Sequence, residues 1–101
     1  LGWSILNEYA SAFISCGDYI SGNGMRILAN PIRGYQRVVS GESGAVGIGL
    51  LNLLSDDTLC EFRESLKIDS ESVVLLFSTE GDTDVENYMK TIWEGKYSLV
   101  G

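Results

Sequence analysis

Hydrophobic residues recur with helical spacing in five parts of the chain. Apolar positions three and four residues apart are typical of helices with one buried face. Asn30-Pro31 ends the second of these segments, and Thr83 and Glu86 form a capping box at the start of the last. The pattern predicts helices at about residues 4–14, 18–29, 45–54, 56–67 and 83–94.

Two short segments have the pattern of strands. Residues 37–40 are built on Val38 and Val39, and residues 73–78 are apolar on both faces, as a central parallel strand is. The order strand, helices, strand, helix favours an α/β fold with a parallel sheet. We therefore expect a fragment of a three-layer parallel sheet with flanking helices. Since two strands are few for an independent sheet, we expect it to be part of a larger domain.

This topology makes a geometric prediction. A right-handed crossover returns the second strand parallel to the first, so Ser40 and Ser78 should end at the same edge of the sheet. Neighbouring strands lie about 4.8 Å apart, which places the two residues roughly 5–12 Å apart at Cα. The polar turns that follow them would then face one cleft.

Composition narrows the possible functions. The chain has 101 residues, room for a single domain spanning residues 1–101, and its first residue is Leu1, which suggests a piece of a longer polypeptide. A net charge of −7 argues against nucleic-acid binding. No apolar run is long enough to cross a membrane. The absence of histidine excludes the usual triads and histidine–metal sites within the chain.

Two segments could carry chemistry. Residues 40–47, Ser-Gly-Glu-Ser-Gly-Ala-Val-Gly, place glycines and Glu42 where a strand gives way to a helix. They match neither a Walker loop nor GxGxxG, and the alternative is a small-residue helix face that packs tightly. Residues 78–84, Ser-Thr-Glu-Gly-Asp-Thr-Asp, follow the most apolar strand, where ligands of parallel sheets collect. They could equally be a polar turn before a capped helix. Their carboxylates lack the calcium-loop pattern, and no metal site is predicted.

The two segments together, in this order and separation, resemble the C-terminal part of the diaminopropionate ammonia-lyases. That family belongs to the tryptophan-synthase-like (fold type II) pyridoxal-phosphate enzymes. The resemblance covers essentially the whole chain, including the flanks 18–31 and 88–95. It implies α,β-elimination of 2,3-diaminopropionate to pyruvate and ammonia, by a cytoplasmic homodimer. The implied partners are an amino-acid substrate, the remainder of the parent chain and a second copy of the enzyme, with no nucleic acid and no membrane.

The resemblance also assigns cofactor-binding roles. In relatives a serine or threonine at the end of the last core strand bonds the pyridine nitrogen, which implies Ser78, with Thr79 as the second choice. The family's Glu-Pro-small-small turn beside the ring corresponds to Glu42-Ser-Gly44-Ala here.

The family's Schiff-base lysine, phosphate loop and catalytic carboxylates lie in earlier sequence, so no catalytic residue is predicted in this chain. None of its three lysines, Lys67, Lys90 and Lys96, has a matching context. The resemblance therefore implies an inactive portion of the enzyme's cofactor domain. The alternative is a stand-alone, non-catalytic α/β module that binds or senses a ligand.

Overall fold

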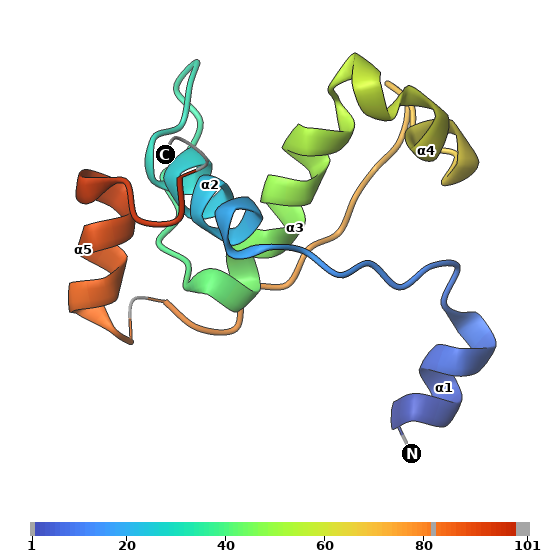
Figure 1. The fold of residues 1–101 in the computed structure, drawn as a ribbon, viewed down its shortest axis with the longest axis horizontal. Coiled ribbons are helices and arrows are strands. Elements are labelled where there is room, and N and C mark those ends of the chain that lie inside the picture. The colour runs from blue at the N-terminus through green and yellow to red at the C-terminus, as the bar shows by residue number, and fades with distance from the viewer. Residues whose placement is uncertain (1, 82, 99–101) are drawn as a thin grey trace.

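A computed structural model describes residues 2–81 and 83–98 of the chain. The described residues form five α-helices and one short 3-10 helix, joined by extended segments (Figure 1). In chain order the elements are α1 Gly2–Tyr9, α2 Asp18–Ala29, α3 Glu42–Leu54, η1 Asp57–Leu59, α4 Cys60–Ser65 and α5 Val85–Glu94. All five predicted helices are therefore present, although α1 ends and α3 begins earlier than the sequence pattern suggested.

The core is the crossing of α2 and α3, and glycine makes it possible. A Cβ on Gly24 would lie 2.0 Å from the carbonyl oxygen of Ala45, and one on Gly49 would lie 2.0 Å from that of Ile20. Real side chains do not approach so closely, so the two backbones touch only because both positions lack a side chain. Gly24 and Gly49 are thus packing residues of the contact between α2 and α3.

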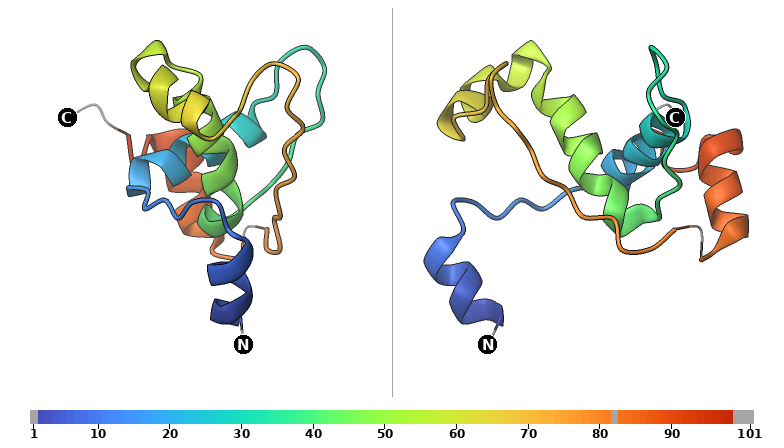
Figure 2. Two further views of the ribbon diagram at one scale, coloured as in Figure 1. Left: turned by 90° about the vertical axis from the view of Figure 1, so that its right-hand side faces the viewer. Right: turned by 180° about the vertical axis from the view of Figure 1, so that it is seen from behind.

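Helix α5 closes the other side of α2. Met25 of α2, Ala45 of α3 and Tyr88 of α5 form the buried cluster, with Leu28 and Ile92 packed against it. Arg26 ties α2 to the end of α5: its guanidinium donates to the carbonyl oxygens of Thr91, at 3.2 Å, and of Lys96, at 3.0 Å. Helix α2 therefore packs against both α3 and α5, and it lies between them in the right view of Figure 2.

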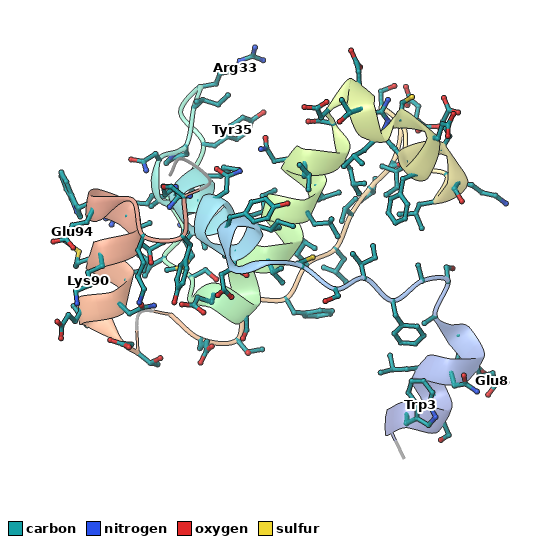
Figure 3. The ribbon with its side chains drawn as sticks, in the orientation of Figure 1. Trp3, Glu8, Arg33, Tyr35, Lys90 and Glu94 are labelled. Carbon is teal, nitrogen blue, oxygen red and sulfur yellow. The ribbon has the colours of Figure 1, made fainter. Side chains whose placement is uncertain are left out.

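The outer elements contribute little to this core. Helix α1 packs against none of the other described helices and projects from the body of the molecule, with Trp3 and Glu8 at its surface (Figure 3). At the far end of α3, Asp56 caps η1 by accepting a hydrogen bond of 2.9 Å from the backbone N–H of Thr58. This bond lowers the pKa of the Asp56 carboxyl below its usual 3.8. No helix in the described part of the chain is long and apolar enough to cross a membrane.

The prediction of a parallel sheet is wrong. Residues 37–40 and 73–78 run as extended backbone, but the described residues contain no strand or β-bridge. A strand exists only through hydrogen bonds to a neighbour, and no backbone hydrogen bond joins these two segments along their lengths. One bond, from the Gly41 N–H to the Glu80 carbonyl at 3.3 Å, connects them just beyond their ends.

Residues 73–77 keep the alternation of a strand without the pairing. Val73, Leu75 and Phe77 are 98%, 76% and 76% exposed, whereas Val74 and Leu76, which point the other way, are 45% and 42% exposed. Leu76 packs on α3, where a Cβ on Gly47 would lie 2.7 Å from its side chain. One face of this segment is therefore docked and the other is open apolar surface.

Candidate functional site

The two polar segments singled out in the sequence meet in the folded chain. The hydroxyl oxygens of Ser40 and Ser78 lie 2.8 Å apart and share a hydrogen bond across 38 residues of sequence. Ser40 is 1% exposed, at the last position before the turn into α3, whereas Ser78 lies at the surface. The prediction that the two turns lie close together is therefore confirmed, even though the described residues do not form the sheet that was expected to bring them together.

Gly44 fits directly against this hydroxyl pair. A Cβ at Gly44 would lie 2.6 Å from the Oγ atoms of both Ser40 and Ser78 and 3.0 Å from the Ser78 Cα. Any side chain there would displace one hydroxyl or the other. The need for glycine at position 44 is thus explained, because the first segment approaches the second closely at this point.

A cavity of about 260 Å³ lies beside the pair, between the first turn of α3 and the loop that leads into α5. It is slightly smaller than the usual pocket for a whole cofactor or drug-sized ligand, so it has room for part of one. Its lining comes from both segments and from the faces of α2 and α5 that turn toward them: Met25, Gly41, Glu42, Ser43, Glu80, Gly81, Thr83, Asp84, Asn87 and Tyr88.

Glu42 and Asn87 form the polar contact across this cavity. The Asn87 side-chain amide donates to Oε1 of Glu42 at 2.8 Å, which joins the first turn of α3 to the first turn of α5. Asp84 caps α5 by accepting a hydrogen bond of 3.1 Å from the Asn87 backbone N–H. The predicted Thr83 and Glu86 capping box is therefore replaced by an Asp84 cap. The Tyr88 hydroxyl is buried without a hydrogen-bond partner among the described residues.

Of the four predicted cofactor residues, Glu42 lines the cavity, and Gly44 and Ser78 lie at the adjoining hydroxyl pair. Thr79 is exposed next to Ser78 and lines no part of the cavity. The sequence analysis placed Ser40 in the candidate segment 40–47 but gave it no cofactor role. It did not include Asn87, which has no local signal because its partner Glu42 is 45 residues away.

The described side chains of this site combine hydrogen-bond donors and acceptors. Two hydroxyls, a carboxylate and an amide offer both donors and acceptors within a few ångströms. Of the carboxylates in residues 80–84, Asp82 lies outside the described residues. No group of three or more potential metal ligands gathers in the described part of the chain. The side chains that line this site can hold a flat polar ligand by hydrogen bonds at its edge.

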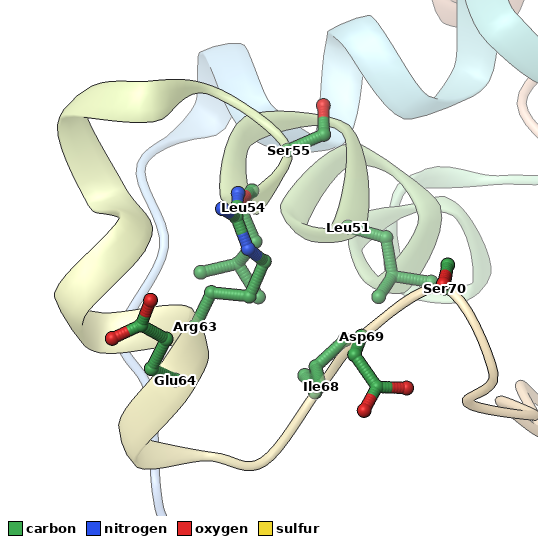
Figure 4. A pocket seen from close by; sticks show the side chains of 8 residues that line it. All are labelled: Leu51, Leu54, Ser55, Arg63, Glu64, Ile68, Asp69 and Ser70. Atoms are coloured by element: carbon green, nitrogen blue, oxygen red, sulfur yellow. The ribbon is translucent and has the colours of Figure 1, made fainter.

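A larger cavity lies elsewhere. It has a volume of about 600 Å³ and sits at the far end of α3, against α4 and the segment that follows it (Figure 4). Arg63 spans it and donates to the Leu54 carbonyl at 2.7 Å. None of its lining residues belongs to residues 40–47 or 78–84, so it has no part in the site described above.

Comparison with known proteins gives one consistent answer. No protein-family model matches the chain. It is 46% identical over 100 residues to the diaminopropionate ammonia-lyase of Escherichia coli strain K12, and 40% identical over 98 residues to that of Salmonella typhimurium strain LT2. These matches cover 98% and 95% of this chain but 25% and 24% of the two enzymes. The chain therefore spans about a quarter of the length of the curated relatives it matches.

Solved structures agree with the sequence matches. The apo form of the Escherichia coli enzyme superposes with a TM-score of 0.91 over 97% of this chain and 27% of that one, at 46% identity. The same enzyme in complex with an aminoacrylate-PLP azomethine reaction intermediate gives a TM-score of 0.90 over 96% of this chain and 26% of that one, also at 46% identity. That relative therefore binds pyridoxal phosphate. In sequence and in the course of its backbone, this chain matches one segment, about a quarter, of the diaminopropionate ammonia-lyases.

Proposed function

We propose that this chain is the C-terminal part of a pyridoxal-phosphate-dependent ammonia-lyase that converts 2,3-diaminopropionate to pyruvate and ammonia by α,β-elimination. The observation that carries the proposal is the 46% identity over 98% of the chain to an enzyme of that name. The contact between the two polar segments supports it independently, because it builds a small polar site from the residues on which the resemblance rested.

In this proposal the cofactor supplies the electron sink for the elimination, and the chain supplies the edge of its binding site. Ser78 would hold the pyridine nitrogen through its hydroxyl, which shares a hydrogen bond of 2.8 Å with the Ser40 hydroxyl. A neutral hydroxyl there would leave the nitrogen largely unprotonated and so moderate the sink. Gly44 leaves space for the hydroxyl pair, and Glu42, at the cavity wall, would help to hold the ring.

The remainder of the enzyme belongs to the same proposal. The Schiff-base lysine, the phosphate loop and the catalytic carboxylates would come from sequence before this chain. That sequence would also cover the open face formed by Val73, Leu75 and Phe77. The whole enzyme would be a cytoplasmic homodimer acting on a small amino acid.

The test compares the chain with the complete polypeptide. The purified 101-residue chain, mixed with pyridoxal phosphate and diaminopropionate, should release no pyruvate above buffer in a coupled dehydrogenase assay. The complete polypeptide should release two molecules of ammonia for each molecule of pyruvate, because both amino groups of the substrate are lost. Pyruvate release by the chain alone would disprove that the activity depends on a Schiff-base lysine in earlier sequence. No pyruvate from the complete polypeptide would disprove the lyase assignment and favour a ligand-binding module.

A further inference from the structure

Asn87 is held in one orientation by two neighbours of opposite character. Its side-chain oxygen accepts a hydrogen bond from the ammonium of Lys96, and its side-chain nitrogen donates to Oε1 of Glu42 at 2.8 Å. An ammonium group can only donate and a carboxylate can only accept, so the amide cannot be flipped without losing both bonds. The chemistry of these two neighbours therefore identifies which end of the Asn87 side chain is the oxygen and which is the nitrogen.

The position of Lys96 is itself fixed by the fold. Gly95 ends α5 with φ of +74°, a left-handed conformation that reverses the chain and brings Lys96 back along the helix. The Lys96 carbonyl then accepts a hydrogen bond from Arg26 of α2 at 3.0 Å. The ammonium group of Lys96 lies 4.8 Å from the centre of the Tyr97 ring. A turn anchored on α2 thus sets the direction of the Asn87 amide.

This arrangement restricts the side chain of Glu42. It lines the cavity, and its hydrogen bond to Asn87 is its only one within the described residues, so its second carboxylate oxygen is available to a ligand. A glutamate side chain has three rotatable bonds and would otherwise sample many positions at the start of α3. The amide of Asn87 removes most of that freedom.

We propose that Asn87 is a positioning residue that holds the Glu42 carboxylate toward the cofactor cavity, with Lys96 fixing the direction of its amide. This inference rests on the proposed function, since it assigns Glu42 a place beside the bound pyridoxal phosphate. Asn87 also lines the cavity, but Glu42 and Lys96 occupy the two ends of its amide, so in this proposal it acts through Glu42.

The test uses the complete polypeptide and the affinity for pyridoxal phosphate, measured by titrating the cofactor-free protein and following visible absorbance. Asn87→Ala and Glu42→Ala should each weaken binding by roughly tenfold, the loss expected for one hydrogen bond to a charged group. The double variant should be no weaker than Glu42→Ala alone. The backbone contacts of Asn87 with Asp84 and Thr91 survive in the alanine variant, so α5 should still form.

Two further variants separate positioning from packing. Asn87→Asp has almost the same shape but places a carboxylate opposite Glu42, so it should bind the cofactor no better than Asn87→Ala. Glu86→Ala lies on the same helix, where Glu86 pairs with Lys90 at the surface, and it should bind like the wild type. Wild-type affinity in Asn87→Asp, or additive losses in the double variant, would overturn the proposal.

A measurement on the cofactor-free protein distinguishes a failure of the positioning role of Asn87 from a failure of the proposed function. In the nitrogen–proton NMR spectrum of the cofactor-free protein, Glu42→Gln should move the side-chain amide signal of Asn87, while Glu86→Ala should leave it in place. If that signal does not respond, the positioning role is disproved whatever the enzyme does. If it responds but the wild type binds no pyridoxal phosphate, the proposed function fails instead.

Discussion

At the scale of single residues, Ser78 and Thr79 offer adjacent hydroxyls with different surroundings. Ser78 lies against Gly44 and shares a hydrogen bond with a buried serine, whereas Thr79 is exposed and lines no part of the cavity. A hydroxyl that is held by a second group is oriented before a ligand arrives, and this lowers the cost of binding. Both residues are exposed and neither lines the cavity, so the hydrogen bond to Ser40 is the feature that favours Ser78 in the proposed function.

This difference predicts the outcome of two alanine substitutions in the complete polypeptide. Ser78→Ala should lower turnover more than Thr79→Ala, because it leaves a buried ring nitrogen without a partner at a cost of about 1–3 kcal/mol. Steady-state pyruvate release measures the effect, with circular dichroism as the control for folding. A larger loss in Thr79→Ala, with both proteins folded, would move the assignment by one residue.

At the scale of elements, the contact between α2 and α3 depends on the absence of two side chains. Gly24→Ala should destabilise the chain by about 1–3 kcal/mol, because its Cβ would lie 2.0 Å from the Ala45 carbonyl oxygen and force the helices apart. Gly2→Ala is the matched control, since a Cβ there meets nothing within 4 Å. Urea unfolding followed by circular dichroism measures both. Equal midpoints for the two variants would contradict the close crossing.

The elements also show which features a sequence can predict. The spacing of apolar residues located α2 and α5 because a helix makes its hydrogen bonds within its own segment. The same reasoning predicted strands at 37–40 and 73–78, but a strand requires a partner, and the described chain provides none. The link between Glu42 and Asn87 escaped prediction for a related reason: it depends on how α3 and α5 are placed around α2.

At the scale of the whole molecule, the dominant feature is open apolar surface. Val73, Leu75 and Phe77 form a row of exposed side chains beside unpaired backbone, and Trp3 and Trp93 are 66% and 77% exposed. Apolar surface beside unpaired extended backbone favours association with other chains. The matched relatives are about four times longer than this chain, so most of such an enzyme lies outside the segment described here.

The isolated chain should therefore self-associate. Light scattering at increasing concentration should show particles larger than the 11.0 kDa monomer, together with binding of a dye specific for apolar surface. Replacing Leu75 and Phe77 with serine should reduce both signals. The control is the replacement of Leu76 with serine, since Leu76 packs on α3 and its loss should destabilise the fold without reducing association. A monomeric wild-type chain that binds no dye would contradict this expectation.

The paired hydroxyls of Ser40 and Ser78 have a consequence for proton direction. Three hydrogen bonds are possible around them: one between the two hydroxyls, one from Ser40 to the Gly41 carbonyl at 3.1 Å and one from Ser78 to the Glu80 carbonyl at 3.4 Å. The two hydroxyls have one proton each, so only two of the three bonds form at once. A ligand atom that accepts a hydrogen bond from Ser78 selects the state in which Ser40 donates to Ser78, and the unprotonated ring nitrogen of the proposed function would require that state. The pair can reach it by rotating two O–H bonds, with no heavy atom displaced.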